Sequence, residues 1–281
     1  MIIQWYPGHM TKAKRMMQEN IKLIDIVIEI LDARVPISSK NPDIDEIGKH
    51  KPRLVVLNKV DLADDTVTES WINHFKEKGF FVVKANSRSG MGIKQVTNVI
   101  QEACKEKIER DRKRGIINRP IRAMVVGIPN VGKSTFINSI AGKASAKTGN
   151  KPGVTKGKQW IRLNKNIELL DTPGLLWPKF EDQAVGMKLA MIGSIKDELL
   201  NKIEVCLELI RYLVVEYKGV LANRYQVEEV DDSVQMLERI ATSRNVLKTG
   251  SELDLEKTAN IILDEYRNGK IARISLEKVE L

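Results

Sequence analysis

Two short motifs carry residues of the kinds that bind phosphate groups and a purine ring. The first, residues 127 to 135, reads GIPNVGKST and fits the phosphate-loop pattern G-x-x-x-x-G-K-[ST]. In such a loop, glycines let backbone N–H groups surround the phosphates, and the positive end of the next helix faces them. We expect Lys133 to reach the outer phosphates and the Ser134 hydroxyl to bind Mg²⁺. The alternative, a glycine turn without a ligand, fits the flanking strand and helix patterns less well.

The second motif, residues 58 to 61, reads Asn-Lys-Val-Asp and follows an apolar stretch. The Asp61 carboxylate can accept hydrogen bonds from the ring N–H and the exocyclic amine of guanine together, whereas adenine offers no matching pair of donors. An acceptor left buried and unpaired costs about 1 to 3 kcal/mol, which disfavours adenine. A plain polar turn is the alternative for so short a motif. We interpret the tetrapeptide as the guanine-binding element.

Three further loops complete the predicted site. Asp171 begins the stretch DTPG and could bind Mg²⁺ through water, while Gly174 would let a backbone N–H approach the γ-phosphate. An ordinary strand-ending turn is the alternative. Thr155, in PGVTKG, is the candidate for a second hydroxyl on Mg²⁺, and Ser87 could close over the base with its N–H. The predicted contacts to GTP or GDP are Asn58, Lys59, Val60, Asp61, Asn86, Ser87, Asn130, Val131, Gly132, Lys133, Ser134, Thr135 and Gly174.

The elements that must position these residues alternate between strands and helices. Apolar stretches at 25–33, 53–58, 80–85 and 121–127, together with QWIRL and IELLDTPG, are typical of strands. Helices are predicted over 9–24, over TVTESWINHFKEKG, over 91–114 and from Lys133. This alternation predicts a parallel, doubly wound α/β sheet with its ligand at the carboxyl ends of the strands. After Pro178 the apolar residues recur at three- and four-residue spacing, so we predict an α/β domain at 1–178 and an all-helical domain at 179–281.

The order of the motifs is unusual, because the guanine element precedes the phosphate loop by seventy residues. In this order, with PGHM near the start, DAR at 32–34, PGVT, DTPG and a helical tail, the sequence resembles the YlqF/RbgA family of ribosome-assembly factors. The resemblance implies a circularly permuted P-loop GTPase. Permutation is physically permitted, since the chain ends of such a sheet often lie close together. The resemblance also implies a role late in assembly of the large (50S) ribosomal subunit.

The residue that drives hydrolysis is not evident. Many GTPases place a glutamine after the DTPG glycine, but here Leu175 follows and cannot orient water. Besides Lys133, two groups could contribute to catalysis. Asn130 matches an asparagine with which related families bind K⁺ beside the phosphates, although it could equally cap its loop. His9 could orient or activate water when a partner presses the N-terminus onto the site, although a lone histidine is more often a surface residue. Both imply slow intrinsic hydrolysis that a partner accelerates.

The charge distribution favours a polyanionic partner. The net charge is +9, and residues 1–180 hold 32 Lys and Arg against 18 Asp and Glu, whereas the remainder is acidic. A basic run is often only a solvated surface, but RNA is the simplest partner, recognised by its phosphates and shape. The family resemblance narrows this to rRNA of the large subunit, with the tail able to contact a ribosomal protein. The predicted RNA contacts are Lys12, Lys14, Arg15, Lys143, Lys147, Lys151, Lys156, Lys158 and Arg162.

Other features exclude some classes of protein. The first fifteen residues lack the apolar run of a signal peptide, and no stretch approaches the eighteen apolar residues of a membrane helix. Cys104 and Cys206 form no C-x-x-C pair, so we expect two buried thiols in a cytoplasmic, monomeric protein. Two other functions stay open: a GTPase linked to tRNA or RNA modification, for which no catalytic motif is evident, and a GTP-dependent binding module without hydrolysis.

Overall fold

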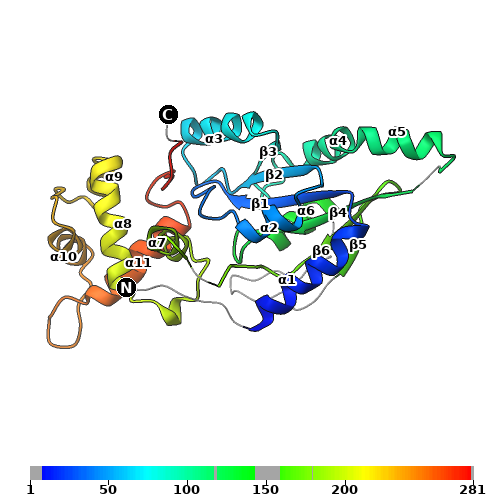
Figure 1. The fold of residues 1–281 in the computed structure, drawn as a ribbon. Coiled ribbons are helices and arrows are strands. Elements are labelled where there is room, and N and C mark those ends of the chain that lie inside the picture. Colours follow the sequence, from blue (N-terminus) through cyan, green and yellow to red (C-terminus); the bar gives the residue numbers. More distant parts are fainter. Residues whose placement is uncertain (1–7, 117–118, 143–158, 179, 280–281) are drawn as a thin grey trace.

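The fold is built on one six-stranded sheet, with a group of helices at one end of it (Figure 1). The computed structural model describes residues 8–116, 119–142, 159–178 and 180–279, apart from the side chain of His9. The sheet order is β3-β2-β1-β4-β6-β5. The strands are β1 (Ile26–Asp32), β2 (Arg53–Asn58), β3 (Phe81–Ala85), β4 (Ile121–Val126), β5 (Gln159–Arg162) and β6 (Ile167–Asp171).

Five strands are parallel, and their carboxyl ends lie at one edge of the sheet. Asp32 at the end of β1 pairs in register with Asn58 at the end of β2, and Asn58 pairs with Ala85 at the end of β3. Every residue of β1 is buried, as expected for a central strand with both faces covered. The α/β fold predicted from the sequence is confirmed, and the sheet brings the loops after β1, β2, β3, β4 and β6 together.

The edge strand β5 departs from the parallel sheet that the sequence predicts. It pairs with β6 in the antiparallel direction, with Trp160 opposite Leu170 and Arg162 opposite Glu168. The cause is the short connection between Arg162 and Ile167, closed by a bond from Leu163 N–H to the Ile167 carbonyl. So short a link can form a hairpin, whereas a parallel pair needs a crossover of a dozen or more residues.

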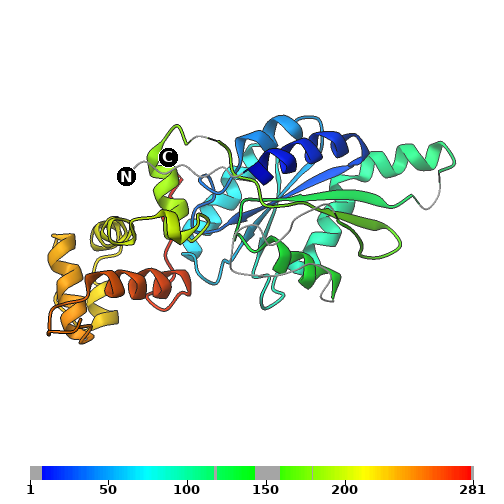
Figure 2. The same cartoon turned by 90° about the horizontal axis from the view of Figure 1, so that it is seen from below.

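Helices cover both faces of the sheet. Figure 2 shows α1 and α2 on one face and α6 on the other, and α4 packs beside α6. The predicted helix over 91–114 is two helices, since Cys104 turns away from helical geometry where the apolar face of α4 gives way to the charged α5. The helices are α1 (Gly8–Asn20), α2 (Pro42–Ile47), α3 (Asp65–Glu77), α4 (Ile93–Ala103), α5 (Lys105–Lys113) and α6 (Lys133–Ala141).

The segment after residue 180 is helical in the described part of the chain, with one isolated bridge between Leu247 and Leu253. Its core is formed by α8, α10 and α11, which pack on one another. Both cysteines are free and buried, as predicted. None of the described helices combines the length and apolar character needed to cross a bilayer. The helices are α7 (Gln183–Met191), α8 (Lys202–Glu216), α9 (Val220–Tyr225), α10 (Ser233–Ser243) and α11 (Leu255–Arg267), with a short 3-10 turn at Asp197–Leu199.

Candidate nucleotide-binding site

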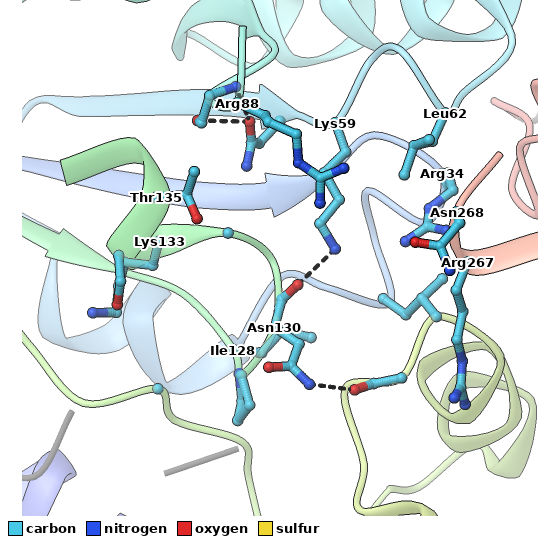
Figure 3. Close-up of a pocket in the computed structure, with 18 of the residues that line it drawn as sticks. Arg34, Lys59, Leu62, Arg88, Ile128, Asn130, Lys133, Thr135, Arg267 and Asn268 are labelled. Atoms are coloured by element: carbon cyan, nitrogen blue, oxygen red, sulfur yellow. Dashed lines mark hydrogen bonds between the residues drawn. The ribbon is translucent and has the colours of Figure 1, made fainter. Parts of the chain in front are cut away.

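A cavity of about 650 Å³ lies at the carboxyl ends of β2 and β4. One wall comes from the loops after these strands, and the opposite wall comes from residues 192–198 and the end of α11. Figure 3 shows Lys59 and Asn130 in the middle of this space, with Lys133 and Thr135 on one side and Arg34, Asn268 and Arg267 on the other. Of the predicted contact residues, those that line the cavity are Asn58, Lys59, Asp61, Asn86, Ser87, Asn130, Gly132, Lys133, Ser134, Thr135 and Gly174.

The loop between β4 and α6 has the backbone geometry that its glycines predict. Gly132 adopts a left-handed conformation with φ of 91°, and α6 begins at the next residue, Lys133. A Cβ atom on Gly127 would lie 2.8 Å from the carbonyl oxygen of Ile30, so the loop can leave the sheet only without a side chain there. The N-terminus of α6 therefore faces the cavity, where its N–H groups favour an anion.

The guanine-type motif and the phosphate loop are bound to each other. Asn58 Nδ2 donates to the Val131 carbonyl at 2.8 Å, and Lys59 Nζ donates to the Asn130 carbonyl at 2.6 Å. The approach is so close that a Cβ on Gly132 would lie 2.4 Å from Asn58 Nδ2. The two motifs, far apart along the chain, form one continuous cavity wall.

The loop after β3 is attached to the same asparagine. Asn58 Oδ1 accepts hydrogen bonds from the Ser87 N–H at 3.0 Å and from the Ser87 hydroxyl at 2.8 Å. Asn86 caps its own loop, because its Oδ1 accepts from the N–H groups of Arg88 and Ser89. Asn58 thus links three loops, and the Ser87 N–H, which we expected at the base, is directed at Asn58 in this structure.

A buried carboxylate lies behind Lys59. Asp32 accepts two hydrogen bonds from the Arg34 side chain, at 2.9 and 2.8 Å, and its Oδ2 lies 3.0 Å from Lys59 Nζ. Burial alone would raise the pKa of Asp32, but Arg34 and Lys59 outweigh burial and hold it well below its usual range. The Arg34 guanidinium also lies over the Tyr266 ring of α11, 5.3 Å from its centroid. Lys59 is therefore held between β1 and the phosphate loop.

The other end of the site joins Lys133 to the DTPG turn. The ammonium of Lys133 contacts the Asp171 carboxylate, and both side chains are buried. Burial lowers the pKa of the Lys133 amine, and the neighbouring carboxylate opposes that shift. A Cβ on Gly174 would lie 3.0 Å from the Pro129 nitrogen, so the turn packs directly against the phosphate loop. Ser134 lines the cavity, whereas Asp171 is 1% exposed and is not among the lining residues. Their hydroxyl and carboxylate oxygens have the chemistry that Mg²⁺ prefers.

Some predicted residues lie outside the cavity wall. Val60 and Val131 are buried beneath it and contribute backbone carbonyls rather than side chains. Leu175, in place of the usual glutamine, is 1% exposed and belongs to the core. His9 belongs to α1 by its backbone, but its side chain lies outside the described residues, as does Thr155.

The cavity includes residues that the sequence patterns do not identify as contacts. Arg34 belongs to the DAR motif, and Arg88 directly follows Asn86 and Ser87. Their positions in or beside a motif could have identified both arginines as cavity residues. Arg267 and Gly193 come from the helical segment and carry no such signal. Asn130, a candidate ligand of K⁺, donates through Nδ2 to the Gly193 carbonyl at 2.6 Å. The phosphate loop is thereby attached to the turn after α7.

Four of the nine predicted RNA contacts belong to the described residues, three on α1 and one on β5. Lys12 and Arg15 are exposed on α1, and Arg15 pairs with Glu19. Lys14 is half-buried and pairs with Asp43 at 2.7 Å. Arg162 is exposed at the end of β5. The remaining predicted contacts lie outside the described residues: Lys143, Lys147, Lys151, Lys156 and Lys158.

Comparisons with known proteins agree with this geometry. Residues 122–247 match the model of a family described as 50S ribosome-binding GTPase. The chain is 50% identical to Ribosome biogenesis GTPase A of Bacillus cereus over 100% of its own length and 95% of that protein. It is 49% identical to the Priestia megaterium protein of the same name, over 99% of this chain and 97% of the other.

Solved structures show the same likeness. GNP-bound YlqF from T. maritima superimposes with a TM-score of 0.65 at 28% identity, covering 95% of this chain and 98% of that one. The GDP-bound form of that YlqF gives a TM-score of 0.67 at 27% identity, covering 94% and 99% of the two chains. The two structures are described as GNP-bound and GDP-bound, respectively.

Proposed function

The chain belongs to the ribosome biogenesis GTPase A family and is a GTP hydrolase, and from this premise we propose that it assists assembly of the large ribosomal subunit at a late step. In the proposed cycle the GTP-bound protein docks on the immature 50S subunit, and hydrolysis releases it. The structural observation that supports the GTP cycle is the cavity formed where Asn58 and Lys59 bind the phosphate loop, and the family supports the ribosomal role. In this cavity a guanine ring can lie at the turn that carries Asp61 while its triphosphate lies at the phosphate loop.

We propose the following arrangement of the nucleotide. The Asp61 carboxylate accepts from the guanine ring, and the aliphatic part of Lys59 lies against the plane of the base. The N–H groups before α6 and the Lys133 ammonium hold the phosphates, which would draw Lys133 from Asp171. Ser134 and Asp171, with Thr155, would then hold Mg²⁺. When bound, that ion offsets the charge of the phosphates. Gly174 offers its N–H near the γ-phosphate.

We propose that the motif order reflects circular permutation of a P-loop GTPase. Two features support this: β1 and β2, which precede the phosphate loop in sequence, extend the sheet on the far side of β4, and the segment 93–120 leads from the loop after β3 into β4. In the proposed permuted chain, the γ-phosphate sensors at Thr155 and Gly174 come just before a helical domain at 179–281 in sequence. The bond from Asn130 to Gly193 gives this domain a direct contact with the phosphate loop.

The proposed route to hydrolysis does not use a glutamine. Leu175 is buried in the core and has no group that could orient water. We propose that His9, one residue into α1, supplies this function when the ribosome positions the N-terminus. A K⁺ ion held partly by Asn130 is a second proposed contributor, and it would require the Asn130 side chain to turn away from Gly193.

We propose rRNA as the surface that the basic residues contact. Lys12, Arg15 and Arg162 are exposed and could reach phosphates, and the long basic run at 143–158 adds to this charge. Recognition by phosphates predicts affinity that falls steeply with salt. A contact between the helical domain and a ribosomal protein remains part of the proposal.

GTP hydrolysis measured with and without large subunits, in K⁺ and in Na⁺, tests the proposed function. We expect a slow intrinsic rate that rises strongly when subunits purified before their final assembly steps are added. A rate that subunits leave unchanged would contradict the ribosomal role. Stimulation that is equal in K⁺ and Na⁺ would contradict the proposed role of K⁺ but not the proposed ribosomal role.

A further inference from the structure

The last described residues, 270–279, return from the helical segment to the sheet and lie against the turn that carries Asp61. In Figure 1 this tail runs from the end of α11 towards α3, which begins just after that turn. About two hundred residues of sequence separate the turn from the tail, yet Arg273 of the tail is hydrogen-bonded to Ala63 of the turn. The tail also lies beyond residues 122–247, the part that matches the family model.

Arg273 holds the turn on both sides of Asp61. Its Nη2 donates to the Val60 carbonyl at 2.8 Å, and its Nε donates to the Ala63 carbonyl at 3.0 Å. Its two terminal nitrogens also contact the Asp65 carboxylate, each at 2.5 Å. A planar guanidinium is suited to bridging acceptors in this way, because its donors have a fixed geometry.

The backbone of the tail adds further bonds to the same turn. Ile274 N–H donates to the Leu62 carbonyl at 3.0 Å, and the Ser275 hydroxyl accepts from the Asp64 N–H at 3.1 Å. Ser275 is itself anchored to α8, since its carbonyl accepts from the Tyr212 hydroxyl at 2.9 Å. The tail is therefore a bridge between the helical segment and the turn.

The tail adds to a small number of bonds within the turn itself. Lys59, at its start, has φ of 61°, a left-handed conformation that a residue with a side chain adopts at an energetic cost. Within the turn, Leu62 N–H donates to the Lys59 carbonyl at 2.9 Å, while the bond from Ala63 to Val60 is long at 3.4 Å. The tail supplies partners for the carbonyls of Val60, Leu62 and Ala63, which lie before and after the exposed Asp61 in the chain.

We propose that the tail is part of the guanine site and that Arg273 is a positioning residue for guanine recognition. Arg273 touches no nucleotide; it fixes the two carbonyls that flank Asp61, so that the carboxylate keeps the direction needed to accept two hydrogen bonds from the ring. This inference rests on the proposed role of Asp61. If the inference holds, the affinity for guanine nucleotides depends on residues 270–279 as well as on the α/β domain.

Arg273→Ala is the direct test, measured as the dissociation constant for GDP. We expect GDP binding to weaken about tenfold, because two charge-assisted hydrogen bonds to the turn are lost. Arg273→Lys keeps the positive charge but lacks the planar guanidinium, so we expect a smaller loss of GDP affinity than in Arg273→Ala. The lysine variant replaces the alanine variant in this test if the latter does not fold. Lys278→Ala is the matched control: Lys278 lies in the same tail and is 53% exposed, but it pairs with Glu216 of α8. That control should bind GDP like the wild type.

A double-variant cycle separates positioning from general destabilisation. If Arg273 acts through Asp61, Arg273→Ala should weaken GDP binding only about twofold or less when Asp61 is already alanine. Equal losses in both backgrounds, or wild-type affinity in Arg273→Ala, would overturn the inference. A wild-type protein that does not bind GDP would instead overturn the proposed nucleotide site, so the two failures are distinguishable.

Discussion

Lys59 Nζ donates to the backbone carbonyl of Asn130 at 2.6 Å, although 71 residues separate the two in sequence. The bond crosses from the end of β2 to the loop after β4, and Asp32 holds the same ammonium from behind. It explains how two motifs in an unusual order form one cavity.

Gly132→Ala should break one of the two bonds that join the motifs, the one from Asn58 to Val131. An added Cβ would lie 2.4 Å from Asn58 Nδ2, so the amide must leave the Val131 carbonyl. We expect GDP affinity to fall by more than about tenfold. Gly79→Ala is the matched control, because Gly79 has a similar φ of 81° with nothing within 4 Å of the added atom. Both variants should lose about 1 kcal/mol of stability from backbone strain. Equal GDP affinity in the two variants would contradict the proposed connection.

Asp32→Asn should destabilise the protein in a manner that depends on pH. Removing one partner of a buried ion pair costs about 3 kcal/mol or more at neutral pH. The folded-state pKa of Asp32 lies below the unfolded value of about 3.9, so its stabilisation is complete above that value and is lost as the pH falls towards the folded pKa.

Urea unfolding at a series of pH values checks this prediction. The stability gap between the wild type and Asp32→Asn should be constant from about pH 7 to 5 and should narrow below about pH 4. Glu19→Gln removes an exposed ion pair with Arg15 and should change stability by less than about 1 kcal/mol. A gap that widens on acidification would show that the sign of the Asp32 contribution is wrong.

Leu175→Gln should not create a faster GTPase. Leu175 is 1% exposed, so a glutamine there would be buried in the core rather than directed at water. We expect no increase in intrinsic hydrolysis and a loss of about 1 to 3 kcal/mol in stability from an unpaired amide. Leu199→Gln, at a leucine that is 53% exposed, should leave both quantities unchanged. A clear rise in the intrinsic rate of Leu175→Gln would mean that this position can reach the nucleotide.

His9→Ala should abolish stimulation by the ribosome without changing nucleotide affinity. Loss of a group that orients or activates water lowers the stimulated rate by about a hundredfold or more. GDP affinity should stay within about twofold of wild type, because the proposed guanine and phosphate contacts do not include His9. His50→Ala, at an exposed histidine after α2, is the control. Full stimulation of His9→Ala would exclude this residue from the proposed mechanism.

Local sequence patterns were sufficient to predict most of the elements that position the site. The strand predicted at 53–58 has those bounds, and the helix predicted from Lys133 begins there. These patterns are reliable because buried parallel strands and glycine loops have strong local requirements for residue type. The antiparallel direction of β5 was not predicted, although the short link between QWIRL and IELL is a local feature that favours a hairpin over a parallel pair.

Contacts between distant segments could not be predicted in the same way. Asp32 and Arg34 were visible as a motif, but their bond to Lys59 depends on strand order. Arg273 lies in an irregular segment without periodicity, and its partners at Val60 and Ala63 are backbone carbonyls. Backbone acceptors leave no residue-type signal in a single sequence, so only the folded structure reveals such support.

Calorimetric titration of the wild type and Asp61→Ala with GDP and with ADP tests the central claim most directly. The wild type should bind GDP and discriminate strongly against ADP. Asp61→Ala should lose about 1 to 3 kcal/mol of GDP binding while its weak ADP binding stays unchanged. Equal affinity of the wild type for the two nucleotides, or unchanged GDP affinity in Asp61→Ala, would contradict a guanine site formed by the turn at 58–61 and the phosphate loop.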